Sequence, residues 1–231
     1  AISVSRLVYN RPQRPCTTIR WPPMTGARVP RVAALYRYPV KGFTPEACNT
    51  RAISQDGRVA GDRVLGVRFA DSPAPDDAWG PKAGMLALVN TPGLARLHLG
   101  FDGRANRLRI GLGQDTLVEA ALDDVGRRRI AAVLADYVLT LPENPLAHHP
   151  ERLPLRVIGD GVSPRYHDSQ AGTVTLHGRG SLAALAADLG TAQVSELRFR
   201  SNVAVEGLEP WEEQAWVGRR VRIGDLDFNV V

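Results

Sequence analysis

Three short segments of the sequence combine residue types that could do chemistry. The pair His148-His149 suggests a metal site, but no cysteine or carboxylate cluster accompanies it at zinc-like spacing, so we expect a solvated loop. Residues 167–169, His-Asp-Ser, contain the residue types of a hydrolytic triad. A triad forms from residues that meet in the folded structure, so their adjacency in the sequence is no evidence for one. Residues 209–213 could supply a carboxylate pair, but a short acidic loop in solvent is the stronger interpretation. These segments alone identify no activity.

Other general signatures are incomplete. The stretch Gly111-Leu112-Gly113 lacks the full dinucleotide-binding fingerprint and the helix that should follow it, and no P-loop is present. The two cysteines, Cys16 and Cys48, are too few for a disulfide scaffold, so we expect a reducing, cytoplasmic environment. No apolar run approaches the roughly eighteen residues needed to cross a bilayer, and we expect no membrane partner.

The basic charge is concentrated at the N-terminal end. The net charge of the chain is +5. The first 45 residues contain eight basic residues and no acidic one, so the positive charge lies in this segment. Such an arm could bind nucleic acid or an anionic membrane, or act as an organelle transit peptide, but we prefer a solvated tail and expect no nucleic-acid partner. Lysine occurs only at positions 41 and 82, a bias toward arginine that we attribute to genome composition.

The elements that must position any site are predicted to be mostly strands. Short apolar stretches separated by Gly, Pro, Asn and Asp favour an all-β sandwich or barrel. The predicted strands are 32–40, 63–69, 86–89, 95–99, 107–112, 116–120, 155–158, 173–176, 197–205 and 219–231. Apolar residues at helical spacing predict one helix within 123–139, capped by Asp123 or Asp124, and another over 181–189, capped by Ser181. Three prolines in residues 141–150 predict a loop and a domain boundary.

Two groups of motifs resemble one known family. Residues 199–202 read Phe-Arg-Ser-Asn, and Pro-Trp-Glu-Glu at 210–213, Trp216 and Arg-Ile-Gly-Asp at 222–225 follow. This order resembles the core signature of MOSC domains, in which Phe-Arg-Pro-Asn precedes an apolar strand, a Glu-Glu-x-x-Trp loop and Arg-Ile-Gly. Upstream, Tyr-Pro-Val-Lys-Gly at 38–42 resembles the Tyr-Pro-Val-Lys-Ser that opens the β-barrel module preceding many MOSC domains. Gly-Asp-Arg at 61–63 and Tyr-His-Asp at 166–168 resemble further family segments.

The resemblance implies a fold and a domain order. It predicts an all-β protein in which a small N-terminal β-barrel module packs on a MOSC-type β-barrel. The expected divisions are a basic arm over residues 1–30, the module over 31–145, and a MOSC domain over 146–231 that is C-terminally incomplete. In this respect the chain resembles bacterial YcbX-like proteins and the mitochondrial amidoxime-reducing component.

The same resemblance implies binding of the molybdenum cofactor, a molybdopterin. Family members reduce N-hydroxylated or N-oxide compounds, with a small-molecule substrate and an electron-donor protein as partners, or they carry cofactor sulfur. Pyridoxal phosphate binding is also associated with the family. The alternative is a non-enzymatic binding module that has lost the metal, so the sequence leaves open whether the chain is an enzyme.

Family motifs carry the expected cofactor contacts over to six positions. A pterin phosphate needs cations, which lysine or a bidentate arginine provides. The expected cationic contacts are Lys41, Arg63 and Arg200. The expected neutral hydrogen-bonding groups are Ser181 and Asn202, with Asp168 nearby.

The resemblance also implies a position for the metal ligand. In molybdenum-bearing members the strand matching residues 225–231 continues into a basic residue, Pro and then Arg-Cys, whose thiolate binds the metal. The sequence printed here stops at Val231. A similar pattern, a basic residue and Pro before Cys16 and a Pro-x-x-Gly at 23–26, occurs in the N-terminal arm. Cys16 is therefore the candidate metal ligand, although chance in a Pro- and Arg-rich arm is the interpretation we prefer.

Overall fold

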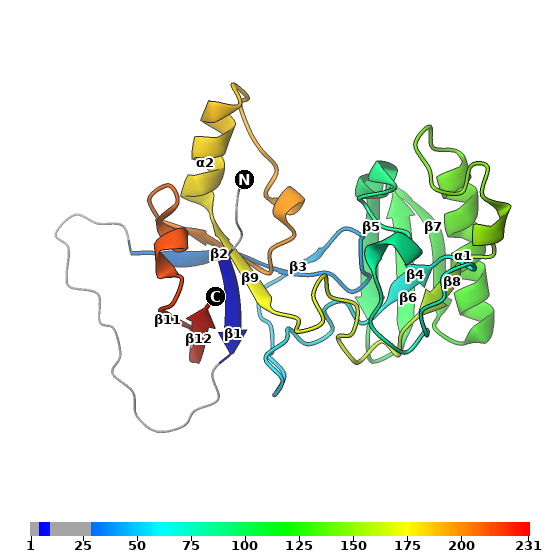
Figure 1. Ribbon diagram of the computed structural model, residues 1–231, viewed down its shortest axis with the longest axis horizontal. Coiled ribbons are helices and arrows are strands. Elements are labelled where there is room, and N and C mark those ends of the chain that lie inside the picture. Colours follow the sequence, from blue (N-terminus) through cyan, green and yellow to red (C-terminus); the bar gives the residue numbers. More distant parts are fainter. Residues whose placement is uncertain (1–4, 10–28) are drawn as a thin grey trace. The chain divides into compact units, whose positions relative to one another are not determined.

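The computed structural model describes residues 5–9 and 29–231 (Figure 1). Strands take up more of this chain than helices, and the predicted all-β class is confirmed. The strands are β1 (Ser5–Tyr9), β2 (Arg31–Arg37), β3 (Glu46–Cys48), β4 (Gly66–Arg68), β5 (Leu97–Asp102), β6 (Arg107–Leu112), β7 (Asp115–Ala121), β8 (Arg156–Ile158), β9 (Val174–Gly178), β10 (Val203–Glu206), β11 (Arg220–Ile223) and β12 (Leu226–Val230). The α-helices are α1 (Asp124–Leu139) and α2 (Arg179–Asp188). Short 3-10 helices are η1 (Lys82–Gly84), η2 (Pro92–Arg96), η3 (Pro150–Arg152), η4 (Glu196–Phe199) and η5 (Glu212–Trp216).

The chain forms two compact units from interleaved segments. Unit 1 contains the described residues up to 36, with 47–59 and 173–231, and unit 2 contains 37–46 and 60–172. The predicted domain boundary at 141–150 lies inside unit 2. The family-based division into 1–30, 31–145 and 146–231 stays a prediction.

Unit 1 is built on a seven-stranded sheet that curls into a half-barrel. The strand order is β11-β12-β1-β9-β10-β2-β3, and the β9–β10 pair is parallel. Strand β1 lies between β12 and β9, with Leu7 opposite both Val230 and Val174. The Leu7 side chain packs with those of the neighbouring strands in one core that includes Leu176 and Phe228.

Unit 2 is built on the antiparallel sheet β5-β6-β7, with α1 packed against it (Figure 1). Alternate residues of β5 are buried, as a sheet with one face in the core requires. Helix α1 buries Ile130, Leu134 and Val138 on the same face, and Asp123 caps it by accepting a hydrogen bond from the Gly126 amide at 2.7 Å. The predicted helix within 123–139 and its cap are therefore confirmed.

Several local predictions are corrected by the structure. Residues 86–89 do not form a strand, because the chain enters a turn at 88–90, where the Asn90 side chain accepts from the Ala87 amide at 2.9 Å. Within residues 197–205 the chain is first the 3-10 helix η4, and Arg200, with φ of +53°, ends it before β10 begins. Strands β1 and β3 were not predicted. The pair His148-His149 is exposed, as expected, and His149 Nδ1 lies 2.7 Å from Glu151 Oε1.

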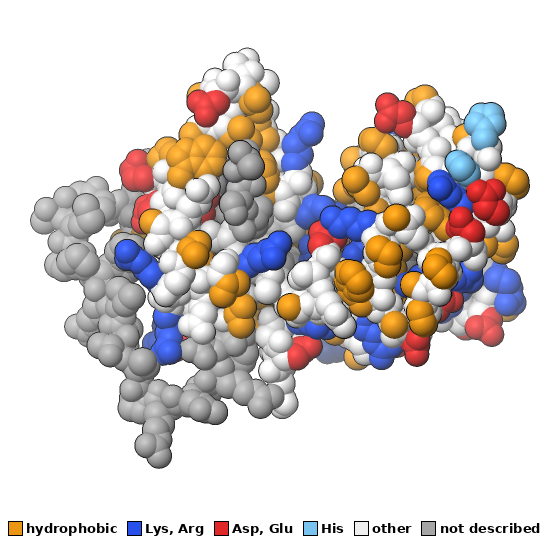
Figure 2. Space-filling model, in the orientation of Figure 1, with side chains coloured by type: hydrophobic (Ala, Val, Ile, Leu, Met, Phe, Trp, Pro, Cys, Tyr) orange, Lys and Arg blue, Asp and Glu red, His pale blue; other side chains and the backbone are white. Residues whose placement is uncertain are grey.

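Neither α-helix of the described chain is long and apolar enough to cross a membrane. On the face seen in Figure 2, basic, acidic and apolar side chains are interspersed over the surface of each unit.

Candidate functional site

Backbone hydrogen bonds bring Lys41 and Arg63 together in unit 2. The Lys41 amide donates to the Leu65 carbonyl at 2.8 Å, and Val40 and Leu65 form a parallel bridge. The Arg63 amide donates to the Tyr38 carbonyl at 2.6 Å. Two motifs that are separate in the sequence therefore run side by side.

A third motif joins them through Tyr166. Its amide donates to the Arg63 carbonyl at 3.0 Å, and its buried hydroxyl donates to the Asp76 carbonyl at 2.5 Å. Burial raises the pKa of Tyr166 to about 12, so the phenol stays protonated and keeps its donor role. These bonds place His167 and Asp168 next to the two cationic motifs.

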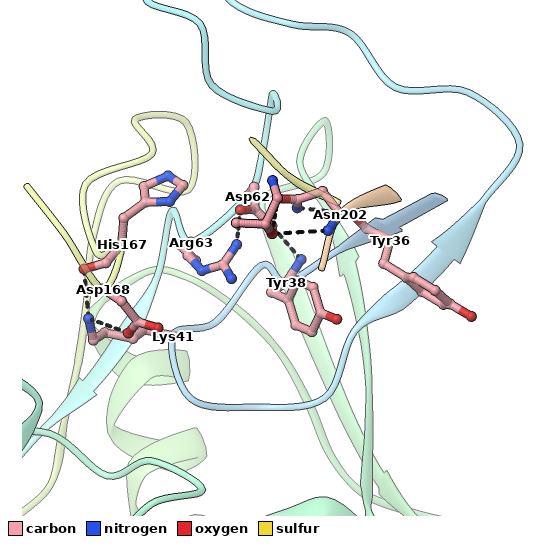
Figure 3. A network of polar contacts seen from close by, with 9 residues as sticks. Tyr36, Tyr38, Lys41, Asp62, Arg63, His167, Asp168 and Asn202 are labelled. Carbon is pink, nitrogen blue, oxygen red and sulfur yellow. Dashed lines mark hydrogen bonds and ion pairs between the residues drawn. The ribbon is translucent and has the colours of Figure 1, made fainter. Parts of the chain in front are cut away.

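Lys41 is the buried lysine of this site. Its side chain is only 3% exposed, and its Nζ lies 2.8 Å from the His167 carbonyl oxygen and 3.5 Å from Asp168 Oδ1 (Figure 3). Burial lowers the pKa of Lys41, and Lys82 and Arg63 act in the same direction, while Asp168 opposes them. The ammonium is thus held where its charge is costly unless an anion lies close to it.

Lys82, the first residue of η1, approaches the same carboxylate. Its Nζ lies 3.3 Å from Asp168 Oδ1, and Trp79 in the loop before η1 donates to the His167 carbonyl at 2.9 Å. Arg68 fixes the loop before η1, because its buried guanidinium donates to the Ala74 and Pro75 carbonyls in that loop. Sequence reasoning missed Lys82, and the available signal was that it is one of only two lysines in the chain.

Asp168 is half-exposed and lies among three cations. Burial acts against its ionisation, but Lys82, Lys41 and Arg63 together outweigh it and lower the pKa of this carboxyl. We call these four residues, Lys41, Arg63, Lys82 and Asp168, the Asp168 cluster.

Arg63 is oriented by its neighbours. Its guanidinium forms a buried ion pair with Asp62 and lies over the Tyr38 ring, 4.9 Å from the ring centroid (Figure 3). The other oxygen of Asp62 accepts from the Tyr38 amide at 2.7 Å. Two of the predicted anion contacts, Lys41 and Arg63, are therefore brought together with the predicted Asp168.

In unit 1, the predicted residue Asn202 joins neighbouring strands. Its Oδ1 lies 3.3 Å from both the amide and the hydroxyl of Thr175, and its Nδ2 donates to the Tyr36 carbonyl at 3.2 Å. The side chain is buried, so these bonds satisfy polar groups that water cannot reach.

Ser181 has a different structural role from the one predicted. Helix α2 begins after Gly178, so Ser181 lies inside it and is not its N-cap. The Ser181 hydroxyl donates to Glu213 Oε2 at 2.8 Å and accepts from the Trp211 amide at 2.8 Å. Glu213 is 2% exposed and also accepts from the Gly178 amide, so the prediction of a solvated acidic loop at 209–213 is wrong for this residue. A cofactor contact by Ser181 would have to share or replace these bonds.

The remaining predicted residues are Arg200 and Cys16. Arg200 is half-buried and adopts the left-handed conformation after η4. Cys16 lies outside the described residues, and Cys48 is half-buried with its Sγ 3.2 Å from the Leu35 carbonyl oxygen. Among residues 5–9 and 29–231, no group of three or more His, Cys, Asp or Glu side chains could hold a metal ion.

A second polar network in unit 1 was not predicted. Glu196 accepts from the Tyr36 hydroxyl at 2.6 Å and binds the Arg179 guanidinium through both oxygens, each at 2.9 Å. The Arg179 hydrogen bond outweighs burial and lowers the pKa of Glu196 to about 2. The buried His177 lies 3.5 Å from the same carboxylate, and burial lowers its pKa. The network joins β2, β9, α2 and η4.

Residues 163–231 match the family model of the MOSC domain. This part of the chain is similar to MOSC domains, and the resemblance inferred from the motifs is confirmed at that level. Among curated proteins, none matches the chain. The matched range contains Asp168, Ser181, Arg200 and Asn202, while Lys41 and Arg63 precede it. A MOSC domain indicates a binding module of the molybdenum-cofactor-sulfurase type.

The Asp168 cluster has the chemistry that the phosphate of such a cofactor requires. It offers two ammonium groups and one guanidinium in unit 2, and two of these cations, Lys41 and Arg63, are buried where an electrostatic contact is strong. The donor set therefore fits an anionic group. The metal end of the cofactor needs a soft ligand, for which Cys16 is the sequence-based candidate.

Proposed function

We propose that this protein binds the molybdenum cofactor and that the Asp168 cluster receives its phosphate. The observation that carries the proposal is the convergence of Lys41, Lys82 and Arg63, from three separate segments, around one half-exposed carboxylate. Cations that gather in this way repel one another, and an anionic ligand relieves that repulsion. The MOSC match over residues 163–231 supports molybdopterin as the source of the anion.

The residues of the cluster have distinct parts in this proposal. Lys41 supplies a buried charge, fixed by the His167 carbonyl at 2.8 Å. Arg63 supplies a planar cation whose orientation Asp62 and the Tyr38 ring hold. Lys82 supplies a third, half-exposed charge that can follow the ligand as it enters. Contacts from Arg200, Asn202 and Ser181 remain predictions, as does binding of pyridoxal phosphate.

When bound, the cofactor would supply a redox-active molybdenum centre. On this basis we propose that the protein is an oxidoreductase acting on N-hydroxylated or N-oxide compounds, or a carrier of cofactor sulfur. The alternative is a binding module without metal chemistry. Cys16 distinguishes these classes, because a thiolate ligand is what the metal end requires.

Retention of the pterin tests the cofactor proposal. Purified protein, at a concentration above the micromolar range, is equilibrated with molybdenum cofactor by dialysis, and the pterin retained on the protein side is assayed after oxidation to its fluorescent derivative. We expect wild type to retain pterin and Lys41→Met to lose most of it. Lys41 is buried and burial lowers its pKa, so an apolar replacement of similar length need not destabilise the fold.

The matched control is Arg107→Met, which removes a half-exposed cation from strand β6 of the same unit. This variant should retain as much pterin as wild type. Equal retention by Lys41→Met and wild type, or no retention by wild type, would contradict the proposal.

Molybdenum analysis then separates the enzyme from the binding module. If the protein is an oxidoreductase, the reconstituted wild type should hold molybdenum and consume a reduced dye when an N-hydroxylated compound is added. Pterin retention without molybdenum or dye oxidation would support the binding module instead. Loss of molybdenum in Cys16→Ala alone would identify the thiolate ligand.

A further inference from the structure

Both lysines of this chain converge on one oxygen atom. Lys41 Nζ lies 3.5 Å and Lys82 Nζ 3.3 Å from Asp168 Oδ1, although the two residues are far apart in the sequence. Every other basic residue is arginine, so lysine is confined to the two positions that face this carboxylate. A composition bias alone does not explain why both lie at the same site.

The carboxylate itself is placed differently from a structural counter-ion. Asp62, which pairs with Arg63, is completely buried and also accepts from the Tyr38 amide. The Asp168 side chain is 55% exposed, and it begins a turn that leads to β9. A change of its side-chain rotamer would therefore move the carboxylate into solvent without moving a helix or a strand.

Lys41 does not depend on Asp168 for its position. The His167 carbonyl accepts from Lys41 at 2.8 Å, and the same carbonyl is fixed by Trp79 at 2.9 Å. If Asp168 turned away, the buried ammonium would remain in place. Lys41, Lys82 and Arg63 carry three positive charges and Asp62 carries one negative charge, so these four residues would then have a net charge of +2, which matches a phosphate monoester dianion.

We propose that Asp168 is a built-in counter-ion that competes with the anionic ligand for Lys41 and Lys82. In the ligand-free protein it neutralises the lysine pair, and a phosphate group binds by taking its place. An anion must therefore bind the lysines more strongly than the Asp168 carboxylate does, so a singly charged anion is rejected and a dianion is accepted. This inference rests on the proposed function for the identity of the ligand, but its test uses inorganic phosphate alone.

The test compares phosphate affinity by isothermal titration calorimetry, at low ionic strength and a pH at which phosphate is mainly the dianion. Asp168→Asn removes the charge while keeping the shape. We expect it to bind phosphate about tenfold more tightly than wild type, the scale of two partly exposed ion pairs. Adding Lys82→Met to this variant should remove most of the gain.

Glu119→Gln is the matched control. Glu119 is half-exposed in unit 2 and pairs with Arg107 at 3.4 Å, so its loss changes the net charge equally without touching the lysines. It should bind phosphate as wild type does. Equal gains in Asp168→Asn and Glu119→Gln, or no gain in Asp168→Asn, would overturn the inference.

The two proposals can fail separately. If wild type retains molybdopterin but Asp168→Asn gains no affinity for phosphate, the counter-ion inference is wrong and the cofactor proposal stands. If Asp168→Asn gains affinity but wild type retains no molybdopterin, the counter-ion is real and the ligand is another phosphate compound. Circular dichroism of each variant verifies that the fold is intact.

Discussion

Gly42 follows the buried Lys41 and has a left-handed backbone, with φ of +79°. A Cβ atom at this position would lie 2.5 Å from the Ala87 Cβ and 2.6 Å from its Cα, closer than atoms can approach. The MOSC module motif has serine here. The left-handed backbone and the close approach of Ala87 therefore favour glycine at this position of the chain.

Replacement of Gly42 by alanine should destabilise the protein by about 2–4 kcal/mol, because the left-handed conformation and the clash both add to the cost. Thermal unfolding followed by circular dichroism measures the effect. The control is Gly113→Ala, where φ is +61° and nothing lies within 4 Å of the added atom, so only the backbone cost of about 1 kcal/mol should appear. Equal losses in the two variants would show that Ala87 moves aside.

At the scale of elements, Glu196 ties β2 and α2 to η4. Its pKa is lowered from 4.5 to about 2, chiefly by the Arg179 hydrogen bond. A carboxylate whose pKa is lower in the folded state stabilises that state above pH 4.5 and loses this contribution as the pH falls toward 2. The side chain is 17% exposed, whereas that of Arg179 is 41% exposed, so solvent weakens the pair.

Glu196→Gln should therefore lower stability by about 1–3 kcal/mol at pH 6 and by much less at pH 2.5. Chemical denaturation of wild type and variant at both pH values measures this difference. Glu119→Gln, at an exposed ion pair, should change stability little at either pH. A Glu196→Gln defect of equal size at pH 6 and pH 2.5 would show that shape, and not charge, explains the loss.

The sequence predicted elements whose signals are local. Helix α1 was predicted because its apolar spacing and the Asp123 cap lie within one stretch of chain. Strand β1 could not be predicted, because its partners β9 and β12 are some 170 and 220 residues away and supply the buried surface that makes it a strand. The turn at 88–90 depends on the Asn90 side chain, which accepts from the Ala87 amide and donates to the Met85 carbonyl.

The candidate site was predictable only in part, for a similar reason. Lys41, Arg63 and Asp168 were found because each lies in a family motif. Lys82 lies in no motif, and only the loop held by Arg68 and Tyr166 brings it to Asp168. Ser181 and Asn202 also lie in motifs, but the structure shows hydrogen bonds that explain them as parts of the fold of unit 1.

At the scale of the whole molecule, each of the two compact units is built from segments that are separate in the sequence. Unit 2 is made of residues 37–46 and 60–172, and it contains the whole Asp168 cluster. The MOSC match covers 163–231, so it includes Asp168 of unit 2 and the whole C-terminal part of unit 1, residues 173–231. The protein therefore cannot be divided into a binding half and a structural half by cutting the chain once, and tests of function require the full chain.

The most direct test of the account is the dissociation constant of the full chain for molybdopterin. Two or three charged hydrogen bonds, reduced by the cost of immobilising the ligand, predict binding in the micromolar range. Lys41→Met should weaken it roughly 10- to 100-fold, the value of one buried charged hydrogen bond, and Arg107→Met should leave it unchanged. Identical dissociation constants for wild type and Lys41→Met would contradict the central claim that the buried lysine of the Asp168 cluster binds the cofactor.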